Sequence, residues 1–380
     1  MTALLFGTYN ARHAANALLV DDLRAAGWQV AECHEPLWER TRDKDAGYFA
    51  PAGLARLAVG YARAVARLAR RFRAASTGAD VLVAGFNGQL DVILLRRLAG
   101  RRPIVFAPLV TVTETLVDDR RSYAPGSAAA RGLRALDRAS LSAADLVVVD
   151  TAAHRDWAAR EVGLDPARTL VQYLGAEAPF EEAPVGPPAP ATRHALEPVR
   201  VLFYGQYLPL HGTDVIARAV ASISPDEGIA FDLVGTGTER AACEALLRGR
   251  PHVRFEDWVA YEDLPARLRS ADVVLGICGG SQKARMVVPN KVWQAAAVGR
   301  AIVTADTPAI REVFVPGESI RLVERDPSVL AAAIRELAAD PAGRERLGEG
   351  ARAAALRAAG ARVRAARLRE ALSRLVAEAA

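Results

Sequence analysis

Residues 288–303 read VPNKVWQAAAVGRAIV, a pattern that predicts a short helix followed by a buried strand. Pro289 suits the first helical turn, and Gly299 ends the helix before the apolar run. Asn290 and Lys291 would then lie in the opening turn, where free backbone N–H groups and the helix dipole attract anions. A capped helix with a solvated lysine would give the same pattern, so both interpretations stay open.

Short apolar segments alternate with amphipathic ones on both sides of this stretch, as is typical of parallel sheets with helical crossovers. The expected strands are Leu4–Gly7, Trp28–Ala31, Val81–Gly85, Ile104–Ala107, Leu146–Val149, Thr169–Gln172, Val199–Tyr204, Phe231–Gly235, Val253–Phe255, Val273–Ile277, Ala301–Thr304 and Ile320–Val323. A chain of 380 residues is too long for one ordinary core. We therefore predict an α/β protein with two Rossmann-like, doubly wound domains facing across a cleft.

The alternation stops where prolines gather, in EEAPVGPPAP at 181–190. Proline fixes φ and lacks the N–H donor, so this segment suits neither a helix nor a central strand. The predicted division is an N-terminal domain over 1–178, a linker over 179–198 and a C-terminal domain over 199–360. A last helix over 361–380 is expected to cross back to the N-terminal domain.

Composition limits the classes of function. A net charge of +5 is mild and does not call for nucleic acid. The three cysteines lie far apart and predict reduced thiols that are not metal ligands, which favours a cytoplasmic protein. No metal and no cofactor are expected. The arginine-rich helical stretches 55–75 and 361–375 suit either a solvated outer helix or a peripheral membrane contact.

Glycine-bearing loops follow the first two strands of the C-terminal domain. Gly205 lets the backbone approach a ligand closely, and His211 precedes the next helix. Gly235 and Gly237 form a G-x-G turn, which is weak evidence because an ordinary tight turn explains it as well. With the helix start at Lys291, these loops end on one sheet edge, which is how nucleotide sites are built.

The loop after the first strand of the chain also faces this predicted cleft. Its polar side chains Asn10, Arg12 and His13 suit contacts with an acceptor or with donor phosphates. An ordinary polar loop between a strand and a helix explains them equally well.

Several motifs occur together and in order. They are YGQYLPLHGT at 204–213, VGTGT at 234–238, DWV at 257–259, ADVVLG at 271–276 and PNKVWQAAAVGRAIVT at 289–304. This combination resembles the retaining glycosyltransferases of family 4, which have the GT-B fold. The resemblance covers the C-terminal domain; the N-terminal domain matches only in its rhythm and in SAADLVVVDT at 142–151.

The resemblance implies a nucleotide-diphosphate sugar as donor, bound by the C-terminal domain, and an acceptor that enters from the N-terminal domain. Gly205 and Gln206 take the places of the family's glycine and basic phosphate partner. His211 stands where a second phosphate-binding lysine is usual, and Lys291 could replace that charge. The backbone around Trp258 and Val259 resembles the contact for the base.

Two positions depart from the family's pattern. Gln294 stands where a carboxylate usually holds the ribose, although an amide can still bond the hydroxyls. Met286 stands where many members have a sugar-contacting glutamate, so Gly279, Gly280 and Ser281 are expected to bind the sugar through backbone N–H groups.

The N-terminal loop over 108–119 lacks the histidine that many members carry beside the sugar. The predicted substitutes for this histidine are Thr111, Glu114 and Asp118. Glu114 is expected to bind the acceptor, and Asp118 is expected to be catalytic together with Lys291 and His211. The predicted function is metal-independent sugar transfer with retention of configuration. A non-catalytic sugar-nucleotide-binding partner and a GT-B epimerase remain alternatives, although an epimerase would need carboxylates that the stretch before Lys291 lacks.

Overall fold

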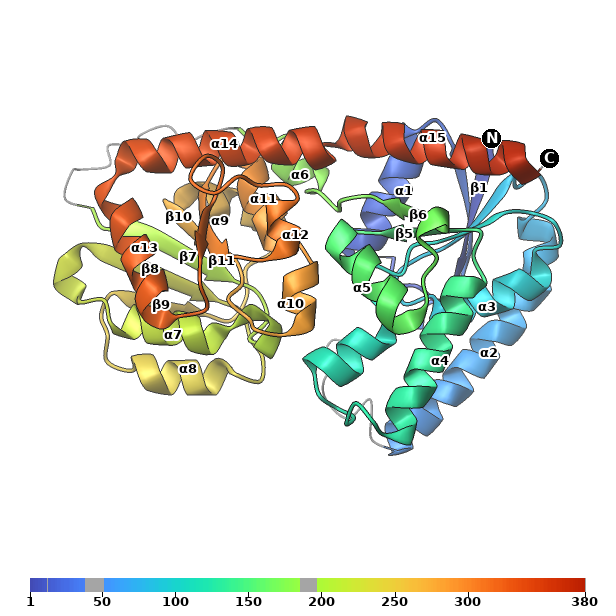
Figure 1. The fold of residues 1–380 in the computed structure, drawn as a ribbon, viewed down its shortest axis with the longest axis horizontal. Coiled ribbons are helices and arrows are strands. Elements are labelled where there is room, and N and C mark those ends of the chain that lie inside the picture. The colour runs from blue at the N-terminus through green and yellow to red at the C-terminus, as the bar shows by residue number, and fades with distance from the viewer. Residues whose placement is uncertain (12, 38–50, 185–196, 380) are drawn as a thin grey trace. The chain divides into compact units, whose positions relative to one another are not determined.

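The computed structural model describes residues 1–11, 13–37, 51–184 and 197–379, and these form two compact units (Figure 1). Unit 1 comprises Met1–Val117, Arg121–Gln172 and Ala361–Ala380, and unit 2 comprises Asp118–Arg120 and Tyr173–Gly360.

Unit 1 is built on a six-stranded parallel sheet with the order β2-β1-β3-β4-β5-β6. Its strands are β1 (Thr2–Gly7), β2 (Gln29–His34), β3 (Val81–Ala84), β4 (Ile104–Phe106), β5 (Leu146–Val149) and β6 (Thr169–Val171). Its helices are α1 (Ala14–Ala25), α2 (Pro51–Ala75), α3 (Gln89–Leu98), α4 (Ala128–Ser142), α5 (Ala152–Val162) and α15 (Ala361–Ala379), with a 3₁₀ turn at Pro166–Arg168. A π-helical segment at Glu114–Asp119 begins in unit 1, and its last two residues are assigned to unit 2.

Helix α15 completes the core of unit 1 although it ends the described chain. It lies along α1 (Figure 1), and Leu368 and Leu372 are fully buried in the cluster that covers β1. Arg364 turns inward from the same helix and pairs with Asp22 of α1, with Nε 3.0 Å from Oδ1. The arginine-rich stretch 361–375 therefore packs one face on the core of unit 1, while Arg362 and Arg369 are exposed.

Unit 2 repeats the plan, with a six-stranded parallel sheet in the order β12-β11-β10-β7-β8-β9. Its strands are β7 (Val199–Tyr204), β8 (Ile229–Val234), β9 (Val253–Glu256), β10 (Val273–Leu275), β11 (Ala301–Ala305) and β12 (Arg321–Val323). Its helices are α6 (Ala178–Glu181), α7 (Thr213–Ala221), α8 (Arg240–Leu247), α9 (Leu264–Ser270), α10 (Gln282–Met286), α11 (Asn290–Ala297), α12 (Pro308–Arg311), α13 (Pro327–Ala339) and α14 (Pro341–Ala359), with 3₁₀ turns at Pro209–His211, Pro225–Glu227 and Tyr261–Asp263.

The predicted pair of doubly wound α/β domains is confirmed by the two sheets. The chain enters unit 2 at Tyr173, before the predicted domain end at 178. The reason is local packing, because the Phe180 ring lies 5.8 Å from the Tyr261 ring and so fastens α6 to unit 2. Most of the predicted linker, residues 185–196, lies outside the described residues.

Membrane contact was left open for the arginine-rich helices. Among the described residues, no helix has both the length and the apolar character needed to cross a bilayer. On α2, Arg67 and Arg71 form ion pairs with Glu35 at 2.7 and 2.8 Å.

Candidate functional site

The strand order of unit 2 directs attention to one edge of its sheet. The chain places β8 and β9 on one side of β7 and β10 to β12 on the other. In doubly wound sheets, ligands bind beyond the carboxyl ends of the strands at such a switch point. The loops after β7, β8 and β10 and the start of α11 come together there, as the contacts below show.

Gly235 and Gly237 let the loop after β8 pack directly on the loop after β7. Their φ angles are +125° and +150°, and a Cβ on either would collide with main-chain atoms of Gly205 or Tyr207. The amide of Tyr207 also donates to the Thr236 carbonyl oxygen at 2.8 Å. Close packing of the two loops is thus enough to explain why glycine occupies both positions. The contact of these glycines with a donor stays a prediction.

Lys291 lies in the first turn of α11, next to the half-buried Asn290. Its residue is only 5% exposed, and its Nζ lies 4.1 Å from the centroid of the Phe203 ring. Among the described residues, Nζ has no hydrogen-bond partner. Gly205 borders the same space, because a Cβ there would come within 2.9 Å of Nζ. Burial lowers the pKa of Lys291 from 10.5 to about 7, since a buried ammonium loses its hydration.

His211 lies beside this amine as a neutral ring. Its Nδ1 donates to the carbonyl oxygen of Gln206, because a carbonyl can only accept. Burial, and then the charge of Lys291, lowers the pKa of His211 to about 3. The ring therefore adds no positive charge for a phosphate, and the exposed amide side chain of Gln206 adds none either. Of these three predicted phosphate partners, Lys291 alone can supply a positive charge.

Gln294 lies one turn after Lys291 on α11 and is held on both sides. Its Oε1 accepts from the Tyr204 hydroxyl at 2.6 Å, and its Nε2 donates to both carboxylate oxygens of Glu177 at 3.0 and 3.2 Å. The Tyr261 hydroxyl also bonds Glu177, and burial and this carboxylate both raise the pKa of Tyr261. Glu177 was not predicted. It brings a carboxylate to the place where the sequence showed only an amide.

The loop after β10 carries the three residues expected to face the sugar. Gly279 packs so closely on the Leu210 carbonyl oxygen that a Cβ would collide with it. The Ser281 hydroxyl caps α10 and is engaged there. Gly280 faces a side chain that the sequence did not reveal, since a Cβ on Gly280 would lie 3.2 Å from Nε of Arg325.

Arg325 follows β12 and adds a second cation to this edge of the sheet. It lies 3.4 Å from the carboxylate of Asp214, a long ion pair between half-exposed side chains. The charges of Lys291 and Arg325 both act on the Cys278 thiol, yet burial dominates and raises the pKa of Cys278 to about 12. The loop after β10 is thus bordered by positive charge.

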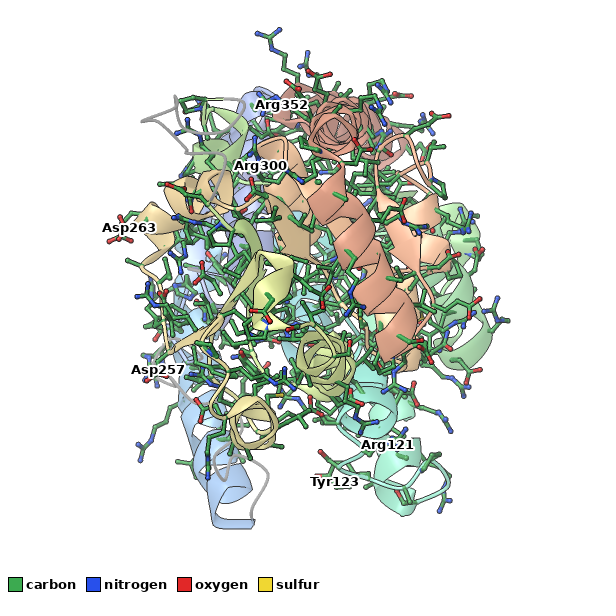
Figure 2. The ribbon with its side chains drawn as sticks, turned by 90° about the vertical axis from the view of Figure 1, so that its left-hand side faces the viewer. Arg121, Tyr123, Asp257, Asp263, Arg300 and Arg352 are labelled. Carbon is green, nitrogen blue, oxygen red and sulfur yellow. The ribbon has the colours of Figure 1, made fainter. Side chains whose placement is uncertain are left out.

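Exposed aromatic side chains follow β9. Trp258 is 78% exposed and Tyr261 is 45% exposed, whereas Val259 is half-buried. Figure 2 shows Asp257 and Asp263, which flank this segment, pointing outward from unit 2. A large exposed indole is unusual on a folded surface and suits stacking against a flat ring.

The predicted acceptor loop of unit 1 is fixed to its neighbour by Asn16. This side chain donates to the Asn10 carbonyl oxygen at 2.9 Å and accepts from the Phe86 amide at 2.8 Å. It therefore joins the loops after β1 and β3, which flank the switch point of this sheet. His13 caps α1, and its ring centroid lies 4.2 Å from that of Phe86. Arg12 lies outside the described residues.

Glu114 differs most from its predicted role. It is 0% exposed, and its Oε2 lies 2.8 Å from Nε2 of His154 and accepts from the Thr111 amide at 3.1 Å. The other ring nitrogen of His154 bonds Asp150 at 2.8 Å. Burial acts to lower the pKa of His154, but the two carboxylates raise it to about 10. Glu114 is therefore a buried ion-pair partner and not an accessible acceptor ligand; Asp118, half-buried in the same π-helical segment, keeps its predicted role as a prediction.

Solved structures of the same architecture span nearly the whole chain. Sucrose-phosphate synthase from Thermosynechococcus elongatus is 17% identical, with 99% of each chain covered and a TM-score of 0.73. HepE from Anabaena in complex with UDP-glucose is 16% identical, with 98% of this chain and 100% of that chain covered and a TM-score of 0.70. A trehalose-6-phosphate synthase from E. coli, bound with UDP-2-fluoro glucose, is 15% identical, with 100% and 99% covered and a TM-score of 0.68. At such identities the likeness establishes the fold, which is GT-B.

The sequence adds a narrower match. Residues 198–340 match the family model described as Glycosyl transferases group 1. The matched segment lies within unit 2 and contains Gly205, Lys291 and Gln294, but not Glu177. No curated protein matches the chain by sequence.

Proposed function

We propose that this protein is a glycosyltransferase that takes a sugar from a nucleotide-diphosphate sugar held by unit 2. The observation that carries the proposal is the amine of Lys291, which is buried, unpaired among the described residues and placed at the switch point of the sheet. Such a group is costly unless an anion pairs with it. The match of residues 198–340 to Glycosyl transferases group 1 supports a sugar donor.

The proposed chemistry needs little from the protein beyond position and charge. When the bond between the sugar and the diphosphate breaks, negative charge grows on the leaving oxygen, and a cation fixed nearby lowers the barrier. Lys291 is proposed to be this cation, and the backbone at Gly205 would let the diphosphate approach closely. Retention of configuration and independence from metal ions belong to the same proposal and rest on the resemblance to family 4.

Recognition of the nucleoside is proposed for the neighbouring groups. Gln294 and Glu177 together offer an amide and a carboxylate, which can bond the hydroxyls of a ribose. The exposed ring of Trp258 suits stacking on the base. HepE in complex with UDP-glucose has this fold, so uridine nucleotides are the first to test.

The acceptor is proposed to bind on unit 1, at the loops after β1 and β3. Asn10 and His13 come from the first loop and Phe86 from the second, and Asn16 holds the two together.

The test is turnover and binding by the purified protein. We expect uridine or guanosine diphosphate to raise the melting temperature, since a ligand at one hundred times its Kd adds about 2.7 kcal/mol. Lys291→Ala should weaken binding by about tenfold or more, because charge-assisted hydrogen bonds contribute about 1.5–3 kcal/mol. Arg218→Ala, which removes an exposed cation from α7, is the matched control and should bind normally.

Transfer itself is followed with a panel of nucleotide sugars and acceptors, and the anomeric configuration of the product is read by NMR. Release of nucleoside diphosphate that depends on an acceptor supports the proposal. Binding without any turnover would leave a sugar-nucleotide-binding protein instead, and an inverted anomer would overturn retention.

A further inference from the structure

Among the described residues, the Lys291 amine has no hydrogen-bond partner that would hold it in the charged form. From β7 the ring centroids of Phe203 and Tyr204 lie 4.1 and 5.9 Å from Nζ, and burial outweighs the weak attraction of these rings for an ammonium. From the loop after β10 comes Cys278, whose thiol is protonated because burial raises its pKa to about 12. From the turn before α7 comes His211, which is neutral.

Three charged groups surround these neighbours of the Lys291 amine. Lys283 of α10 and Arg325 after β12 are cations, and they act on His211 and Cys278 respectively. The carboxylate in this group is Asp214, and it faces Arg325. These groups thus act on the neighbours of the amine, and the carboxylate of Asp214 is engaged by Arg325.

Burial adds to this effect. A lysine that is 5% exposed has lost most of its water, and an ammonium without a partner in such a place is more costly than a neutral amine. Consistent with this, burial lowers the pKa of Lys291 to about 7. Above that pH the empty site holds mostly the uncharged amine.

A nucleoside diphosphate reverses the balance, because its phosphates carry at least two negative charges beside Nζ. We propose that Lys291 is uncharged in the empty site above neutral pH and takes up one proton from solvent when a nucleoside diphosphate binds. The inference rests on the proposed function, since it concerns the same site. The positive charge that would stabilise the leaving group is then created by the substrate that needs it.

The test is isothermal titration calorimetry with uridine diphosphate, and with guanosine diphosphate as a second arm, at pH 8.0. The two buffers used have different ionisation enthalpies. At this pH the terminal phosphate is already ionised, because its second pKa is about 6. The buffer dependence should report an uptake of about one proton per nucleotide. Affinity should also fall about tenfold for each pH unit between 8 and 9.

Two variants serve as matched controls. Lys291→Arg keeps a permanent positive charge, since a guanidinium does not deprotonate, so it should bind without proton uptake. Lys291→Met removes the amine and should lose both the proton uptake and most of the affinity. Circular dichroism and melting curves verify that both variants are folded.

The outcomes separate this inference from the proposed function. Nucleotide binding with no proton uptake by the wild-type protein overturns the inference and leaves the donor site in place. Equal uptake by wild type and Lys291→Arg also overturns it, because another group would then be titrating. Failure of both nucleotides to bind overturns the donor site and the inference together.

Discussion

Glu177 lies in a stretch of chain that the family model does not cover, yet its carboxylate meets the amide of Gln294. No local pattern in the sequence indicates this contact, because the two residues are 117 positions apart. The structure shows Gln294 on α11 and adds its contact with Glu177, and the ribose contact of Gln294 stays a prediction.

A binding series tests whether Glu177 contacts the ribose. Glu177→Gln should weaken the binding of uridine diphosphate by about tenfold, since hydrogen bonds to a charged group contribute about 1.5–3 kcal/mol. Glu182→Gln, which alters an exposed carboxylate nearby, should bind like the wild type. The loss should be smaller for 2′-deoxyuridine diphosphate, which lacks one hydroxyl. An equal loss for both nucleotides would mean that Glu177 acts only by holding Gln294.

Among the elements, the π-helical segment Glu114–Asp119 contacts the buried His154 through Glu114. His154→Gln would leave Glu114 and Asp150 facing each other without a cation, and breaking a buried ion pair costs about 3–5 kcal/mol. The double variant His154→Gln/Glu114→Gln carries one charge fewer and should recover part of the loss. Urea unfolding of the three proteins measures this, and a single variant as stable as the wild type would show that the charge is unimportant.

The same histidine makes a pH prediction. Its pKa rises from 6.5 to about 10 on folding, so the folded state binds the extra proton between these values. This contribution to stability is complete below pH 6.5 and disappears as the pH rises through 10. The urea midpoint of the wild type should therefore fall toward alkaline pH, and the slope of this fall should be smaller in His154→Gln.

At the level of elements, the strands were the most predictable part. Leu146–Val149 and Val199–Tyr204 have the predicted bounds, because short apolar runs between turn residues leave little alternative to a buried parallel strand. The π-helical segment was not predicted. It contains Glu114, whose contact with His154 joins residues 40 positions apart and has no local signal in the sequence. Lys291 was placed correctly in an opening turn because Pro289 and Gly299 mark both ends of its helix, but its burial depends on Phe203 from another strand.

For the molecule as a whole, the Arg364–Asp22 pair connects the last helix to the first, and both residues are almost fully buried. Arg364→Met should cost about 3–5 kcal/mol at pH 8, because Asp22 is left charged and buried. Burial already raises the pKa of Asp22 to about 6 despite the arginine, so the deficit should shrink at pH 5 as the carboxyl takes up a proton. Arg369→Met, an exposed change on the same helix, should alter the melting temperature little. A deficit that does not depend on pH would point to lost packing in place of lost charge.

The position of α15 has a consequence for how the chain is made. Unit 2 runs without a break from Tyr173 to Gly360, and the short segment Asp118–Arg120 joins it from earlier in the chain. Its sheet is complete once Gly360 has been synthesised. The core of unit 1 still lacks Leu368 and Leu372 at that moment. During translation the sheet of unit 2 is therefore complete before the core of unit 1, whose hydrophobic surface over α1 stays open until α15 has left the ribosome.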